Sequence, residues 1–297
     1  MKNLLLKRLS QISVVLQSSL NDLMSVSSFN LAPKNPQIMG VLNVTPDSFS
    51  DGGQFSLVEH AVVQAKLMME AGAEIIDIGG ESTRPGAVKV SVEQELERVI
   101  PVIEAIQQNS DVVISIDTSK PEVMEQAVLA GASIINDVYA LRQPGALEMA
   151  SSLGVTVCLM HMQAEPETMQ QHPEYTDVVD EVVCFFQERL QACQQAGISL
   201  SKILLDPGFG FGKTLAHNMS LLANLEAFKQ YGCPLLVGLS RKSMWGELLN
   251  KKVDERVSAS VISALLAVVN GAAIVRVHDV AEMAEALTIY KALQQAN

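Results

Sequence analysis

Hydrophobic and polar positions follow a repeating order of short and long segments along this chain. Short apolar runs that end on a polar or small residue lie at 37–43, 74–79, 112–117, 133–137, 155–161, 202–206, 234–240 and 273–278. Longer stretches with helical spacing lie between and after them, at 57–71, 91–108, 121–130, 145–152, 175–196, 217–230, 254–270 and 280–294. The short runs are continuously apolar rather than alternating, which is typical of strands buried in a parallel sheet.

Eight such strands, each followed by a helix, predict an α/β protein with a (β/α)8 TIM barrel as a single domain over residues 37–297. An open, doubly wound sheet is the alternative, because a count of strands does not show closure. Residues 1–36 are predicted to be an N-terminal extension, helical or partly disordered. Their basic and apolar start resembles a secretory signal, but Lys7 and Arg8 interrupt the apolar run and no cleavage site is evident.

Composition narrows the classes of partner. The formal net charge of −12 argues against nucleic acid, which requires a basic face, and an anionic substrate would need a locally basic pocket. The four cysteines, Cys158, Cys184, Cys193 and Cys233, form no CxxC pair, so we expect reduced thiols in a cytoplasmic protein. No apolar run outside the N-terminal segment is long enough to span a membrane, and no membrane partner is expected.

One glycine-rich stretch, LLDPGFGFGKT (204–214), looks at first like a nucleotide-phosphate loop. That loop needs a glycine five residues before Gly212, because its backbone N–H groups must wrap the phosphates. Pro207 occupies the position and has no N–H. The pattern therefore disfavours a nucleotidase, and Lys213 and Thr214 are predicted to be incidental to chemistry.

Polar residues mark the strand ends, where a barrel of this class carries its active site. They are Asn43, Asp77, Asp117, Asn136, Asp206, Lys242, Arg276 and His278. Any one of them alone has an ordinary explanation as a helix cap or turn residue. Together they come from seven strands that end at one mouth, which favours a common site.

Seven segments resemble, in order, the motifs of the dihydropteroate synthase family. They are VLNVTPDSFSDGG (41–53), IDIGGESTRPG (76–86), SIDTSKP (115–121), INDV (135–138), LLDPGFGFGKT (204–214), GLSRKS (238–243) and RVHD (276–279). The resemblance covers most of the chain, from about residue 37 to residue 280. It implies a transferase that joins 6-hydroxymethyl-7,8-dihydropterin pyrophosphate to 4-aminobenzoate, forming 7,8-dihydropteroate and pyrophosphate in folate biosynthesis.

For the pterin, the resemblance implies a pocket of five residues. Asp206 accepts hydrogen bonds from the 2-amino group and ring N–H, as a charge-assisted pair. Asn136 donates and accepts on the same edge, and Lys242 donates to the ring acceptors. Asp117 lies close to where positive charge develops, and Phe211 lines the pocket.

For pyrophosphate, the resemblance implies Arg276 and His278, with the helix that starts near Val280 directing its N–H groups to the same place. Asn43, Thr83 and Arg84 are assigned to the same subsite, and Asn43 is also assigned as a ligand of Mg²⁺, which touches the pyrophosphate. The catalytic residues expected from the resemblance are Asp117, Lys242, Arg276 and His278.

Two loops rich in Gly, Pro, Ser and Asp, at 45–53 and 82–90, suit segments that close over a substrate. The resemblance assigns the aminobenzoate to Phe49, Thr83, Pro85, Lys242 and Ser243, and gives Asp51 and Arg84 the role of ordering the loops. It implies a dissociative substitution, which needs no activated nucleophile. The sequence contains no set of the Ser-His-Asp kind.

Alternatives stay open for function and assembly. A pterin-dependent methyltransferase would share Asp117, Asn136 and Asp206, and a catalytically silent pterin-binding paralogue would keep the pocket. Segment 254–270 mixes small residues with Val, Ile and Leu around much of its circumference, which predicts a symmetric homodimer built partly on this helix. The alternative is a helix packed deeply against the barrel.

Overall fold

The computed structural model describes residues 35–45, 53–82, 89–164, 168–170 and 173–296. Its strands are β1 (Gln37–Asn43), β2 (Ile75–Gly79), β3 (Val113–Asp117), β4 (Ile134–Asp137), β5 (Thr156–Met160), β6 (Ile203–Asp206), β7 (Leu235–Val237) and β8 (Ala272–Val277). Every neighbouring pair is parallel, and β8 pairs with β1, so the sheet closes. Closure confirms the (β/α)8 barrel and excludes the open sheet.

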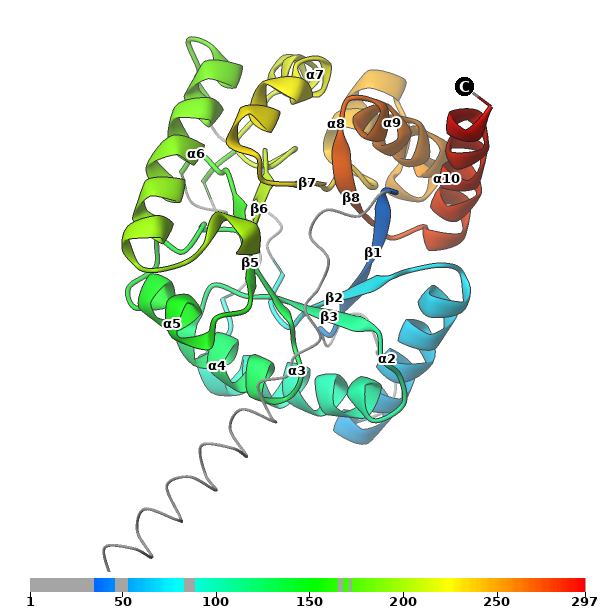
Figure 1. Cartoon of the computed structure of the whole chain (residues 1–297). Coiled ribbons are helices and arrows are strands. Elements are labelled where there is room, and N and C mark those ends of the chain that lie inside the picture. The colour runs from blue at the N-terminus through cyan, green and yellow to red at the C-terminus, as the bar shows by residue number, and fades with distance from the viewer. Residues whose placement is uncertain (1–34, 46–52, 83–88, 165–167, 171–172, 297) are drawn as a thin grey trace, which may run out of the picture. The chain divides into compact units, whose positions relative to one another are not determined.

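Helices surround the strands (Figure 1). They are α2 (Gly53–Glu70), α3 (Val92–Gln107), α4 (Pro121–Leu129), α5 (Ala146–Leu153), α6 (Val178–Gln195), α7 (Leu215–Ala223), α8 (Ser243–Leu249), α9 (Val257–Val269) and α10 (Val280–Gln295). Short 3-10 helices lie at η2 (Leu200–Lys202), η3 (Leu225–Tyr231) and η4 (Val253–Glu255). None of these described helices is long and apolar enough to cross a membrane.

Start signals in the sequence explain where several helices begin. Ser91 caps α3 in a capping box with Gln94, so both orphan backbone donors are satisfied. Pro121 opens α4, where its missing N–H costs nothing. The prediction for residues 1–36 stays a prediction, because residues 1–34 lie outside the described part of the chain.

Apolar packing between strands and helices forms the core. Ile76 and Ile78 of β2 are fully buried, and Phe186 of α6 meets Phe228 of η3 edge to face at 5.7 Å between ring centroids. Polar side chains are also fully buried: Asp77 and Ser115 occupy paired positions on β2 and β3. A buried carboxylate needs partners, which lie at the mouth of the barrel.

Three segments differ from the predicted elements. The run 234–240 forms a strand only over β7, which contains a register shift between Leu235 and Leu236. Helix α8, which follows that turn, was not predicted; it spans seven residues and has no side-chain cap. The predicted helix 217–230 is α7 followed by the 3-10 helix η3.

Candidate active site

Arg276 of β8 connects two carboxylates from neighbouring strands. Its Nε donates to Asp77 Oδ2 at 2.6 Å, and its Nη2 donates to Asp117 Oδ2 at 2.8 Å. Asn136 Nδ2 also donates to Asp77 Oδ2, at 3.2 Å. The structure therefore brings together Asp77, Asp117, Asn136 and Arg276 as expected. A phosphate group bound at Arg276 would accept from the same guanidinium that already donates to both carboxylates.

Burial and charge set the protonation of this cluster. Burial raises the pKa of Asp117 to about 7; Arg276 opposes the rise and Asp77 adds to it. Burial works against the charge of Arg276, but Asp77 and Asp117 raise its pKa, so it stays a cation. The cluster thus holds a carboxyl group that titrates near neutral pH beside a permanent positive charge.

Asp206 ends β6 and is buried. Its Oδ1 accepts a hydrogen bond from the backbone N–H of Gly208 at 2.7 Å. Burial raises its pKa, while the Gly208 N–H and the charge of Lys242 work against that rise. The second carboxylate oxygen, Oδ2, is left for another donor, which suits the predicted role at a pterin edge.

Glycine is required in the turn after Asp206. Gly208, Gly210 and Gly212 all have positive φ, between +60° and +78°. A Cβ on Gly208 would lie 1.9 Å from the carbonyl oxygen of His161. The glycines that resembled a phosphate loop therefore allow a close approach between the β6–α7 loop and the end of β5.

Lys213 has a structural role that the sequence did not predict. Its ammonium is buried and donates to the carbonyls of Gly208 and Phe211, each at 2.9 Å. His161 Nδ1 lies 2.9 Å away. Burial, together with the charges of Lys213 and Arg142, lowers the pKa of His161 to about 2, so the imidazole is neutral and accepts from the ammonium.

Thr214 also has a local role, as the N-cap of α7. Its Oγ1 accepts from the backbone N–H of His217 at 3.2 Å, and His217 Nδ1 accepts from the Thr214 N–H at 3.3 Å. This reciprocal pair satisfies the start of the helix. Neither Lys213 nor Thr214 faces a phosphate in the manner of a nucleotide loop.

Lys242 follows β7 and lies beside the β6–α7 loop. Its Nζ is 4.2 Å from the centre of the Phe211 ring, a cation–π contact. Burial lowers the pKa of Lys242 to about 8, with Arg276 acting in the same direction and Asp206 and Asp117 against it. The predicted pterin residues Asp206, Phe211 and Lys242 are thus neighbours.

His278 is held by the β7–α8 turn. Its Nδ1 lies 3.0 Å from Ser240 Oγ, which also accepts from the His278 backbone N–H at 3.2 Å. Burial, together with the charge of Arg276, lowers the pKa of His278 to about 4, so at neutral pH it is an uncharged donor. Helix α10 begins at Val280, as predicted.

Asn43 ends β1 and pairs in register with Gly79, which in turn pairs with Asp117. A Cβ on Gly79 would lie 3.9 Å from Asn43 Oδ1 and 3.5 Å from Asp117 Cβ, so glycine leaves the two side chains room to approach. Over the described ranges, no group of three or more His, Cys, Asp or Glu side chains could hold a metal. Among the described residues the predicted ligand is the amide oxygen of Asn43, and Mg²⁺ there would take further ligands from phosphate and water.

Five predicted residues cannot be placed. Phe49, Asp51, Thr83, Arg84 and Pro85 lie outside the described residues, and their roles stay predictions. Ser243, also assigned to the aminobenzoate, is the exposed first residue of α8.

An ion-paired group beside β2 was not found from the sequence. Lys120 Nζ lies 2.5 Å from both Glu81 Oε2 and Glu95 Oε2. Glu81 Oε1 also accepts from the backbone N–H of Val90 at 3.0 Å. No local signal marks these residues, because Lys120 and Glu81 are 39 positions apart.

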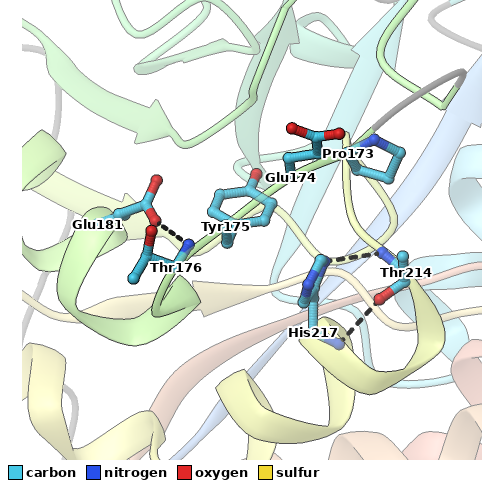
Figure 2. Close-up of a pocket in the computed structure, with 7 residues that line it drawn as sticks. All are labelled: Pro173, Glu174, Tyr175, Thr176, Glu181, Thr214 and His217. Carbon is cyan, nitrogen blue, oxygen red and sulfur yellow. Dashed lines mark hydrogen bonds between the residues drawn. The ribbon is translucent and has the colours of Figure 1, made fainter.

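A pocket beside the β6–α7 loop shares no residue with the polar cluster. Figure 2 shows its lining, which consists of Pro173, Glu174, Tyr175, Thr176, Glu181, Thr214 and His217. Tyr175 donates its hydroxyl to the Gly212 carbonyl at 2.8 Å and packs edge to face on His217. The pocket therefore borders the loop that follows Asp206, and the strand-end residues do not line it.

Comparisons with known proteins agree with this geometry. Residues 39–278 match the family described as pterin binding enzyme. The dihydropteroate synthase of Escherichia coli (strain K12) is 58% identical over 262 residues, which are 88% of this chain and 93% of that protein. A crystal structure of Yersinia pestis dihydropteroate synthase with a sulfonamide drug complex has 51% identity and a TM-score of 0.86, covering 92% of this chain and 99% of the other. Dihydropteroate synthase from Xanthomonas albilineans in complex with 7,8-dihydropteroate has 50% identity and a TM-score of 0.80, covering 88% and 94%.

Proposed function

This chain belongs to the family of pterin binding enzymes and has the dihydropteroate synthase function, and from that premise we propose that the polar cluster at the barrel mouth is its active site. The reaction joins 6-hydroxymethyl-7,8-dihydropterin pyrophosphate to 4-aminobenzoate and releases pyrophosphate. A relative at 50% identity binds the product, 7,8-dihydropteroate. The relatives do not support the methyltransferase alternative, since they are synthases over nearly their whole length.

The observation that carries the pterin assignment is the buried carboxylate of Asp206. One of its oxygens is held by Gly208, which fixes the orientation of the other. A flat ring with two adjacent N–H donors would form a charge-assisted pair there, and the buried site would make that pair strong. Phe211 and Lys242, which already contact each other, would cover the ring.

Three groups with different charge would receive the pyrophosphate. Arg276 supplies a permanent cation, His278 a neutral N–H donor, and α10 its N-terminal backbone N–H groups. Asn43 would hold Mg²⁺ through its amide oxygen, with the remaining ligands from the pyrophosphate and water. When bound, the ion would neutralise charge on the departing phosphate oxygens.

Substitution would proceed by loss of pyrophosphate before attack. The bond from the methylene carbon to the pyrophosphate oxygen breaks, and its electron pair leaves with the pyrophosphate. Asp117 in its ionised form, together with Asp77, favours the cation that remains on the pterin, because Arg276 carries only one positive charge against these two carboxylates. The amine nitrogen of 4-aminobenzoate then forms the new bond and loses its proton to water.

A symmetric homodimer on α9 is also part of the proposal. The helix buries Ser260, Ser263 and Ala264, whereas Ile262 and Leu266 are 59% and 50% exposed. Packing against the barrel accounts for the first group only, so the deep-packing alternative leaves the second unexplained. Leu266→Glu should produce a monomer in light scattering at micromolar concentration, and a wild-type monomer there would reject the dimer.

A cytoplasmic location is proposed on the state of the cysteines. Cys158, Cys184, Cys193 and Cys233 are all free. Burial raises the pKa of Cys193 and of Cys233 to about 11, so both stay protonated and unreactive at neutral pH. Fractionation of cells with an antibody against the chain tests the location.

Pyrophosphate release from the dihydropterin substrate with 4-aminobenzoate and Mg²⁺ tests the activity. Asp206→Ala should abolish pterin binding in calorimetry while the circular dichroism spectrum is retained, because the carboxylate serves a ligand rather than the core. Asp111→Asn, at an exposed position, is the matched control and should bind normally. Pterin binding without any release of pyrophosphate would establish the silent paralogue instead.

A further inference from the structure

The β7–α8 turn (residues 238–242) contains a residue in an unfavourable backbone conformation. Arg241 has φ of +56°, in the left-handed region that favours glycine. A non-glycine residue keeps such a conformation only where its surroundings fix it. The turn also carries Ser240, which holds His278, and Lys242, which contacts Phe211.

Residues from α9 and its N-terminus supply that support. Ser260 Oγ accepts from the Arg241 backbone N–H at 2.8 Å. Arg256 Nη1 donates to the carbonyls of Arg241 and Lys242, at 3.2 and 3.3 Å. Both peptide groups around Lys242 Cα are therefore tied to a helix that does not belong to the predicted site.

The Arg256 guanidinium lies between the Lys251 carbonyl and Gly246 of α8. Its Nε and Nη2 donate to the Lys251 carbonyl at 3.1 and 3.0 Å. On the other side, α8 has a glycine in its interior: a Cβ on Gly246 would lie 2.2 Å from Arg256 Nη2 and 2.7 Å from its Cζ. Glycine is unfavourable inside a helix, so its presence at 246 serves the guanidinium rather than α8.

We infer that Arg256 and Ser260 are positioning residues for the proposed pterin site: they hold the β7–α8 turn so that Lys242 and, through Ser240, His278 face the substrate. The inference rests on the proposed function. Gly246 is the third residue that supports the turn, because it leaves the space in which the Arg256 guanidinium lies. None of the three residues is expected to touch a substrate.

Two variants test this from opposite sides of the same contact. Arg256→Lys keeps the charge but cannot reach all three carbonyls, and Gly246→Ala keeps the arginine but places a methyl group where its guanidinium lies. Each should raise KM for the dihydropterin substrate by about tenfold to a hundredfold, since small misplacements of a binding group have effects of this size. Ser258→Ala and Glu247→Ala, at exposed positions on the same two helices, are the controls and should match the wild type.

A pH profile separates positioning from general damage. Burial lowers the pKa of Lys242, with Arg276 on β8, Asp206 on β6 and Asp117 on β3 as the charged groups around it. If the turn loosens, Lys242 gains water, and the alkaline limb of kcat/KM should move to higher pH. Ser260→Ala should move the limb in the same direction by less.

The outcomes are distinct. Variants that melt at lower temperature but keep the wild-type KM and the wild-type alkaline limb would give Arg256 and Gly246 a purely structural role and overturn the inference. Calorimetry with the dihydropterin substrate covers the case in which the wild type shows no turnover. A wild type that binds pterin but releases no pyrophosphate contradicts the proposed function, and weaker pterin binding in both variants would still support the positioning role.

Discussion

Two turns at the barrel mouth present neighbouring parts of the site but are supported in different ways. The β6–α7 loop (207–214) contains its own support: glycines at positive φ, and Lys213, whose ammonium binds carbonyls within the same loop. The β7–α8 turn (238–242) is held from outside, by Ser260 and Arg256 at α9 and by Asp279 beside α10. An internally supported loop has little tolerance for change, whereas an externally supported turn can be loosened by substitutions at a distance.

The largest effect is expected when the internal support is removed. Lys213→Met has nearly the same volume but leaves the Phe211 carbonyl and the His161 nitrogen without their donor, while the Gly208 carbonyl retains the backbone N–H of Phe211. We expect the free energy of unfolding to fall by roughly 3–5 kcal/mol, because two buried acceptors lose their donor at about 1–3 kcal/mol each. Urea denaturation measures the loss. The control is Lys66→Met, because the Lys66 side chain is exposed on α2. A loss under about 1 kcal/mol would mean that the loop does not depend on the ammonium.

The same substitution has a pH dependence with a definite sign. Burial lowers the pKa of Lys213 to about 7, from an ordinary value of 10.5. Between these values the unfolded chain binds a proton that the folded chain does not, so the contribution of Lys213 to the free energy of unfolding rises with pH in this window and is constant below it. The difference between the wild type and Lys213→Met should therefore grow from pH 7 to pH 9. An unchanged difference would show that Lys213 stays charged when folded.

Two glycines with the same backbone conformation allow the cost of left-handed strain to be measured separately from the cost of a steric clash. Gly208 and Gly232 have φ of +69° and +68°, but a Cβ on Gly208 meets the His161 carbonyl whereas one on Gly232 meets nothing within 4 Å. Gly232→Ala should cost about 1 kcal/mol and Gly208→Ala roughly 2–4 kcal/mol, because the second adds a backbone shift to the left-handed strain. Gly208→Ala should also weaken pterin binding through Asp206. Equal costs for the two variants in urea denaturation would mean that the loop moves aside freely.

Topology explains why much of this site could be predicted from the sequence. Parallel strands in a barrel all end at one mouth, so Asp117, Asn136 and Asp206 had to converge once eight strands were recognised. The partner of each side chain could not be predicted, because Arg276 lies 199 and 159 positions from Asp77 and Asp117. The orientation of the Lys213 side chain could not be predicted either. The same sequence is compatible with a lysine that faces a phosphate and with one that faces its own loop.

The elements that escaped prediction have weak local signals. Helix α8 lacks a side-chain cap and contains Gly246, so nothing in its own sequence marks it as a helix. Its beginning depends on the β7–α8 turn, which in turn depends on Arg256 and Ser260, 15 and 19 positions from Arg241. Contacts at such separations become visible only when the chain is folded.

The smallest loss of stability is expected when the external support of the β7–α8 turn is weakened. This change also tests whether the two turns are independent. Asp279 binds the Arg241 guanidinium through both oxygens, at 3.0 and 2.5 Å, but the arginine side chain is 36% exposed. Asp279→Asn should therefore lower the free energy of unfolding by only about 1 kcal/mol. The turns touch through Lys242 and Phe211, so the coupling energy between Asp279→Asn and Lys213→Met measures how strongly this contact links them.

We expect the two losses to add within about 0.5 kcal/mol in a double-mutant cycle, because the hydrogen bonds removed by each substitution lie within a different turn. Urea denaturation of the wild type, both single variants and the double variant measures the coupling. A coupling well above 1 kcal/mol would mean that the turns form one unit, with the Lys242–Phe211 contact as its link. Repeating the cycle with Phe211→Leu would then remove that coupling, since leucine keeps the apolar bulk but not the aromatic face.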